Sequence, residues 1–142
     1  MSIPDLQRAL EFYVEVLGFE EVNRFEWRAG NAWADAVTGL EDSAARAAML
    51  KLGNAFLKLF QFYSPVPEAV QVRRPVCDHG ITHLCLLVTD LDADYDRLLA
   101  AGMSFHNVPD PQNRAVYGRD PDGNVVELLE VLDPSSPMAV KV

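Results

Sequence analysis

The sequence has little cysteine and no long apolar run. Cys77 and Cys85 are the only cysteines among 142 residues and form no Cys-x-x-Cys pair, so we expect two free, reduced thiols. No apolar stretch reaches the about 18 residues of a membrane span. The first residues also lack a basic region followed by an apolar one, which argues against a signal peptide. We therefore expect a soluble cytoplasmic protein.

Basic charge is also scarce. Lys and Arg number 12 and Asp and Glu number 21, which gives 12 − 21 = −9 at neutral pH. A surface of this sign repels polyanions, so nucleic acid is an improbable partner, whereas a cationic ligand is permitted.

Apolar periodicity and turn residues predict the elements of an α+β protein. Leu6, Ala9, Leu10, Tyr13, Val14 and Leu17 form one helical stripe after the capping residue Asp5 and before Gly18. A second helix is expected over 91–101, before Gly102. Strands are expected at 19–28, 47–52, 55–63, 80–89, 103–107, 114–118 and 125–132, with a long connection over 29–46 that includes at most a short helical turn.

The order of these elements repeats. Asp5-Leu6 matches Asp90-Leu91 at an offset of 90 − 5 = 85, and Lys58 matches Glu127 at 127 − 58 = 69. The longer loop of the first half accounts for the difference. An internal duplication predicts a first module at 1–66, a linker at 67–79, a second module at 80–134 and a tail at 135–142.

The repeat predicts that the first module lacks an opening strand. His83 lies seven residues before Asp90, and the matching position, seven before Asp5, is −2. The first copy therefore has no counterpart of His83 in this numbering. We expect the exposed sheet edge left by this strand to pair with another chain, as in a homodimer, or to be covered by the tail.

Three groups of residues resemble a known family. They are Pro4-Asp5-Leu6 through Leu17-Gly18-Phe19, Gly80-Ile-Thr-His83 through Asp90-Leu91, and Asp120-Pro-Asp-Gly-Asn-Val-Val-Glu127-Leu. Together they resemble the vicinal oxygen chelate superfamily, which includes glyoxalase I, methylmalonyl-CoA epimerase, extradiol dioxygenases, and fosfomycin and bleomycin resistance proteins. The resemblance implies a glyoxalase-like fold of two βαβββ modules around a cleft.

The resemblance also implies a metal site and shows where this chain departs from it. Metal-dependent members take one ligand from the first and one from the last strand of each module, which here are His83 and Glu127 in the second module. Lys58 occupies the matching position of the first module, and an ammonium group has no lone pair for a cation. Zn, Ni, Mn, Co or Fe is the expected cofactor, with an incomplete ligand set, because a catalytic zinc usually has three protein ligands.

Three alternatives follow for this site. A longer native chain supplies the missing strand and His, a homodimer partner supplies a donor, or the fold retains its pocket without metal and Lys58 pairs with Glu127. Under the hypothesis that the site holds a metal, Glu127 is also the candidate catalytic base. Lys58, Arg114 and Tyr117 are the candidate substrate contacts.

These residues favour one function over two others. The first hypothesis is a divalent-metal-dependent lyase or isomerase that acts on a small oxygenated substrate. The second is a non-catalytic ligand-binding or drug-resistance protein that uses the same cleft. Extradiol dioxygenation is third, because it requires a 2-His-1-carboxylate iron site and this chain offers one His of that set.

Overall fold

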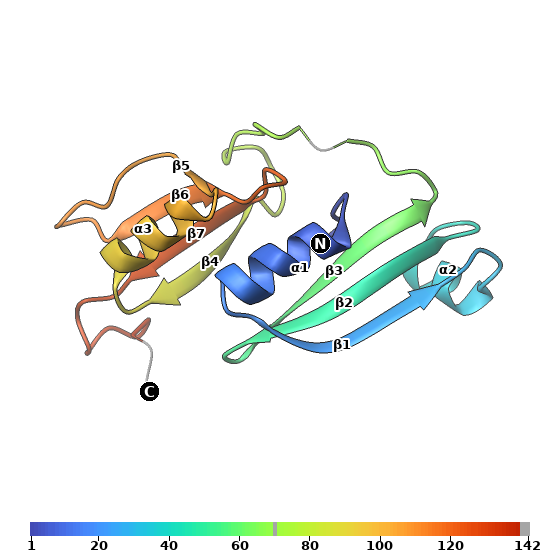
Figure 1. Ribbon diagram of the computed structural model, residues 1–142, viewed down its shortest axis with the longest axis horizontal. Coiled ribbons are helices and arrows are strands. Elements are labelled where there is room, and N and C mark those ends of the chain that lie inside the picture. The colour runs from blue at the N-terminus through green and yellow to red at the C-terminus, as the bar shows by residue number, and fades with distance from the viewer. Residues whose placement is uncertain (70, 140–142) are drawn as a thin grey trace. The chain divides into compact units, whose positions relative to one another are not determined.

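The computed structural model describes residues 1–69 and 71–139, which divide into two compact units. The first unit ends at Ala69 and the second takes in the residues that follow. Each unit contains a helix beside its own β-sheet (Figure 1). None of the helices in the described ranges is long and apolar enough to cross a membrane.

The first unit begins with helix α1 (Leu6–Leu10), which continues as a wider π-helical segment η1 (Glu11–Val16). Asp5 caps α1, because its carboxylate accepts the backbone N–H groups of Gln7 and Arg8. The predicted single helix is therefore confirmed in position, but its second half is π-helical, with the Leu17 N–H donating to the Phe12 carbonyl at 2.9 Å. Gly18 ends it at a φ of 82°.

The sheet of the first unit has the order β1-β2-β3, from β1 (Glu20–Trp27), β2 (Ala44–Leu52) and β3 (Ala55–Ser64), all antiparallel. Helix α2 (Ala32–Thr38) lies in the predicted connection, between its cap Asn31 and the left-handed Gly39. Strand β2 starts earlier than the prediction at residue 47. The alanines before that residue have low strand propensity, but their pairing with both neighbouring strands outweighs it.

The sheet of the second unit has the order β4-β7-β6-β5, from β4 (His83–Val88), β7 (Val125–Glu130), β6 (Ala115–Arg119) and β5 (Ser104–Phe105). Strand β4 is parallel to β7, and the other pairs are antiparallel. Helix α3 (Leu91–Ala100) is capped by Asp90. The strand predicted over 80–89 begins only at His83, where pairing with β7 starts, and Gly80 has a φ of 118°, which is not extended.

Backbone pairing reproduces the repeat seen in the sequence. Ser2 forms an isolated parallel bridge with Phe60, whereas Leu87 pairs in parallel with Leu129. The offsets are 87 − 2 = 85 and 129 − 60 = 69, which are the two offsets of the sequence repeat. That a longer opening strand is missing from the first unit stays a prediction, as do the proposed module boundaries.

The core of each unit lies between its helix and one face of its sheet. In the first unit Leu6, Leu50 and Leu59 are at most 2% exposed, and α1 lies against β2 and β3 (Figure 1). In the second unit the buried side chains include Leu91, Leu98, Val116, Val126 and Leu128. Because side chains alternate along a strand, the other face of each sheet carries a different set of residues.

Candidate active site

The sheet face opposite α3 brings together three residues predicted for the site, His83, Tyr117 and Glu127, and places Cys85 beside them. Cys85 of β4 pairs with Glu127 of β7, which in turn pairs with Tyr117 of β6, so the three form one row across the sheet. His83 lies on the same face as Cys85, because the two residues are two positions apart along β4. We call His83, Cys85, Tyr117 and Glu127 the Glu127 cluster.

His83 is held against Glu127 by contacts on both sides of its ring. Its Nε2 lies 3.3 Å from Glu127 Oε2, and its Nδ1 lies 3.0 Å from the hydroxyl of Thr82. With the ring proton on Nε2, the imidazole donates to the carboxylate and accepts from the Thr82 hydroxyl. The Tyr117 ring centroid is 5.1 Å from that of His83. The side chains of His83 and Glu127 are 32% and 15% exposed, so the carboxylate is the more buried partner.

The thiol of Cys85 and the phenol of Tyr117 are held in their neutral forms beside Glu127. Desolvation raises the pKa of the Cys85 thiol to about 11, and the Glu127 carboxylate adds to this effect. Cys85 is exposed at the sheet surface, yet its neighbours remove part of the thiol's hydration. Desolvation, followed by the hydrogen bond to Glu127, also raises the pKa of the Tyr117 phenol. Both groups are therefore hydrogen-bond donors to the carboxylate at neutral pH.

The second unit alone does not form a complete metal site. Across residues 1–69 and 71–139, no three His, Cys, Asp or Glu side chains lie together in a way that could hold a metal ion. His83 and Glu127 supply two donors, and a third would have to come from outside the unit. The predicted roles of both residues as metal ligands therefore stay predictions.

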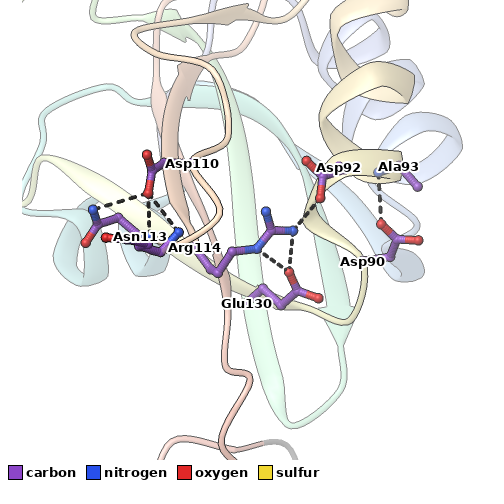
Figure 2. A network of polar contacts seen from close by, with 8 residues as sticks. Asp90, Asp92, Ala93, Asp110, Asn113, Arg114 and Glu130 are labelled. Atoms are coloured by element: carbon purple, nitrogen blue, oxygen red, sulfur yellow. Dashed lines mark hydrogen bonds and ion pairs between the residues drawn. The ribbon is translucent and has the colours of Figure 1, made fainter.

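Arg114 is placed on the other face of the sheet. Its Nε donates to Glu130 at 2.7 Å, and its Nη2 contacts Asp92 at the start of α3 at 2.6 Å (Figure 2). The side chains of Arg114 and Glu130 are only 13% and 12% exposed. Arg114 links α3 to β7, and the structure does not bring this predicted substrate contact together with the Glu127 cluster.

Lys58 lies on the sheet face of the first unit that is opposite α1. Its Nζ stands 5.5 Å from the ring centroids of both Phe25 and Phe60. Within residues 1–69, no carboxylate forms an ion pair with it. The predicted ion pair between Lys58 and Glu127 joins two units that are described separately, so it stays a prediction.

Sequence reasoning missed the aromatic side chains around Lys58. Trp27, Phe60 and Phe62 lie with ring centroids 5.6–6.1 Å apart, and Phe25 stacks on Trp27 at 6.2 Å. The signal was present, because aromatic residues two positions apart in a strand share a face. It occurs at 25 and 27 and again at 60 and 62.

Comparison with known proteins agrees with the fold predicted from the sequence. The Glyoxalase/Bleomycin resistance protein/Dioxygenase superfamily matches residues 1–128. The chain belongs to this superfamily. The resemblance and the glyoxalase-like α+β fold predicted from the sequence are therefore confirmed.

Individual known proteins resemble the chain over most of its length. A 2-epi-5-epi-valiolone epimerase from Actinomyces sp. is 31% identical over 92% of this chain and 75% of its own. A lactoylglutathione lyase from Pseudomonas putida is 26% identical over 92% of this chain and 81% of its own. The crystal structure of a glyoxalase family protein from Bacillus cereus superposes with a TM-score of 0.83 at 26% identity, covering 94% of this chain and 91% of that one.

Proposed function

We propose that this superfamily member is a lyase or isomerase that moves a proton next to a carbonyl group of a small oxygenated substrate, with Glu127 as the base. The observation that carries the proposal is the Glu127 carboxylate itself, which is 15% exposed and lies 3.3 Å from His83 Nε2. A partly desolvated carboxylate beside a positioned imidazole is a suitable pair for general acid–base catalysis.

The proposed step uses only groups of the second unit. Glu127 takes a proton from the carbon next to the carbonyl, and the electron pair of the broken C–H bond moves onto the carbonyl oxygen as an enolate. The Nε2–H of His83 donates to the carboxylate and so orients it for the proton transfer. A proton that solvent delivers to the opposite face of the same carbon inverts its configuration, whereas transfer of the proton from Glu127 to the neighbouring carbon isomerises the substrate. Tyr117 and Cys85, both protonated, hold the carboxylate in place.

The relatives favour this reaction class. The epimerase that is 31% identical to this chain and the lyase that is 26% identical both match it over 92% of its length. Their names describe their own reactions, and we extend to this chain only the class of small-molecule lyases and isomerases. The specific substrate is not part of the proposal.

A divalent metal remains the predicted cofactor. His83 and Glu127 would hold it, and the metal would supply a Lewis acid for the carbonyl oxygen. Because the unit offers two donors where a catalytic zinc usually has three, the step above does not depend on the metal. Metal dependence is tested separately.

The test is exchange of a substrate C–H proton with solvent. Wild-type protein is incubated in D₂O with a panel of 2-hydroxy ketones and polyhydroxylated cyclohexanones, and loss of the α-proton signal is followed by NMR. We expect exchange with at least one compound, and Glu127→Gln should slow it roughly hundredfold or more, because the amide cannot accept the proton. Each reaction is repeated after dialysis against a chelator and after addition of Zn²⁺, Ni²⁺, Mn²⁺, Co²⁺ or Fe²⁺.

Asp96→Asn is the matched control. Asp96 is an exposed carboxylate on α3 in the same unit, and its loss should leave exchange unchanged. Wild-type exchange that survives Glu127→Gln would contradict the assignment of the base. Absence of exchange under every metal condition would contradict the enzyme proposal.

A non-catalytic ligand-binding protein is the second candidate. It is favoured by the two-donor set of the second unit and by Lys58 at the position that matches Glu127. This candidate expects saturable binding of a small molecule, no turnover, and no change on chelation.

A further inference from the structure

The first unit contains a pocket between helix α2 and the sheet face that carries Lys58. Its walls come from β1, α2 and β3, and it has a volume of about 200 Å³. The side chains that line it are mainly aromatic and apolar; they include Phe25, Trp27, Trp33, Val37 and Phe60, with Lys58 as the cation. A cavity of about 150 Å³ is large enough to bind benzene in another protein, so this pocket can receive one aromatic ring.

The cation of this pocket lacks a protein counter-ion within the first unit. Lys58 Nζ lies over the rings of Phe25 and Phe60 at 5.5 Å, and no carboxylate of residues 1–69 pairs with it. Glu26 also borders the pocket, but strand alternation directs its side chain to the sheet face opposite Phe25 and Trp27. Because Lys58 already occupies the ring faces, a cationic ligand would be repelled and an anionic group attracted.

One wall of the pocket is fixed in place. The indole Nε1–H of Trp27 donates to the Ser43 hydroxyl at 3.0 Å, and that hydroxyl donates to Asp35 Oδ1 at 2.6 Å. Ser43 is fully buried, so this chain ties the Trp27 ring to the loop that follows α2. A wall held in its binding orientation loses little conformational entropy when a ligand arrives.

The part of the lining that α2 supplies is exposed within the first unit. Trp33 and Val37 lie on α2, and their side chains are 74% and 66% exposed. A ring that enters the pocket would remove apolar surface of these side chains from water. The pocket therefore combines aromatic surfaces on which a ring can stack with the ammonium group of Lys58, which no carboxylate of residues 1–69 pairs with.

We propose that this pocket binds a small aromatic carboxylate, with the ring against the tryptophans and the carboxylate on the Lys58 ammonium. The lining residues belong to the first unit and none belongs to the Glu127 cluster, so a failure of ligand binding here and a failure of the proposed proton transfer can be told apart. The proposal makes Lys58 an anion-binding residue. At the matching position the second unit has the carboxylate of Glu127.

The test uses the two tryptophans as reporters. Trp27 and Trp33 are the only tryptophans of the chain, and both line the pocket, so intrinsic tryptophan fluorescence reports on this site. Benzoate and its neutral isostere benzamide are titrated at constant ionic strength. We expect a saturable fluorescence change with benzoate, and a dissociation constant for benzamide roughly tenfold higher or more, because a charge-assisted contact is lost.

Matched lysine variants locate the anion contact. Lys58→Met retains the aliphatic stem and should raise the benzoate dissociation constant roughly tenfold or more while leaving that of benzamide unchanged. Lys51→Met is the control, because Lys51 is an exposed lysine of β2 that does not line the pocket. Trp33→Ala should weaken both ligands. Circular dichroism of each variant checks its fold.

Three results would overturn the proposal. The first is no saturable change up to the solubility limit of benzoate, which would mean that another part of the protein or a second copy covers the pocket. The second is equal binding of benzoate and benzamide by the wild type. The third is unchanged benzoate binding by Lys58→Met.

Discussion

The two sheets of this protein share their backbone pairing and differ in the side chains on their open faces. In the second unit Glu127 pairs with Tyr117, and in the first unit the matching residue Lys58 pairs with Met49. One row therefore carries a carboxylate with proton donors, and the other carries an ammonium beside an apolar side chain. The fold depends on the helix-facing side chains, so chemistry on the open face can change without loss of the fold.

The side chains that face the helix are alike in the two units. Leu59 is fully buried in the first unit, and Leu128, its match at the offset of 128 − 59 = 69, is 1% exposed. Each leucine follows the candidate residue of its own strand, Lys58 or Glu127, by one position. The following predictions compare matched positions in the two units.

The largest effect on stability is expected in the two cores. Leu59→Ala and Leu128→Ala should each lower the free energy of unfolding by about 2–5 kcal/mol, because each leaves a cavity in a packed interior. Urea denaturation followed by far-UV circular dichroism measures both. Leu132→Ala is the control, since Leu132 is 66% exposed and its loss should cost less than about 0.5 kcal/mol. If only one of the two substitutions lowered the free energy of unfolding by less than about 1 kcal/mol, the two cores would not be equivalent.

The two hairpin turns before β3 and β7 should differ in how much a side chain of the turn contributes to the free energy of unfolding. Asp120 is 6% exposed, and its carboxylate accepts the backbone N–H groups of Asp122 and Asn124 and the Asn124 side-chain amide at 2.8–3.0 Å. Asp120→Ala should therefore cost about 1–3 kcal/mol, because these donors lose their partner. Asn54→Ala, in the exposed turn between β2 and β3, should cost less than about 0.5 kcal/mol. The same denaturation experiment compares them, and equal costs would contradict the stabilising role of the Asp120 carboxylate.

The smallest expected effect is the influence of the Glu127 charge on the reactivity of the Cys85 thiol. The pKa of Cys85 is raised to about 11 by desolvation and by this carboxylate, so at pH 8 almost all of the thiol is protonated. Glu127→Gln removes a negative charge, lowers the pKa of the thiol and increases the fraction of thiolate, which is the nucleophile. Alkylation of Cys85 by iodoacetamide should become several-fold faster in this variant and should rise with pH toward 11 in the wild type.

Mass spectrometry separates the two cysteines in that experiment. Cys77 is exposed and lies outside the Glu127 cluster, so its alkylation rate should be the same in both proteins. Unchanged alkylation of Cys85 in Glu127→Gln would show that the carboxylate does not influence the thiol.

Particular residues show how far the sequence reached into the site. The family resemblance predicted that His83 and Glu127 belong to one site, and their side chains lie 3.3 Å apart. Tyr117 also lies in the predicted cluster. Arg114 does not, and strand alternation already contained the reason, because 114 and 117 differ by an odd number and so point to opposite faces.

By itself, the sequence determined the duplicated order of elements and the helix ends at Gly18 and Gly102. These follow from local patterns and from comparison of the two halves, whereas the pairing of His83 with Glu127 followed from the family resemblance. Only the tertiary structure decided which side chains meet across strands. Phe25 reaches Lys58 through the register of β1 on β2, which contains an irregularity between Glu21 and Asn23, and then through β2 on β3. A shift of one residue in either pairing would direct these side chains to opposite faces, and local patterns do not specify such a register.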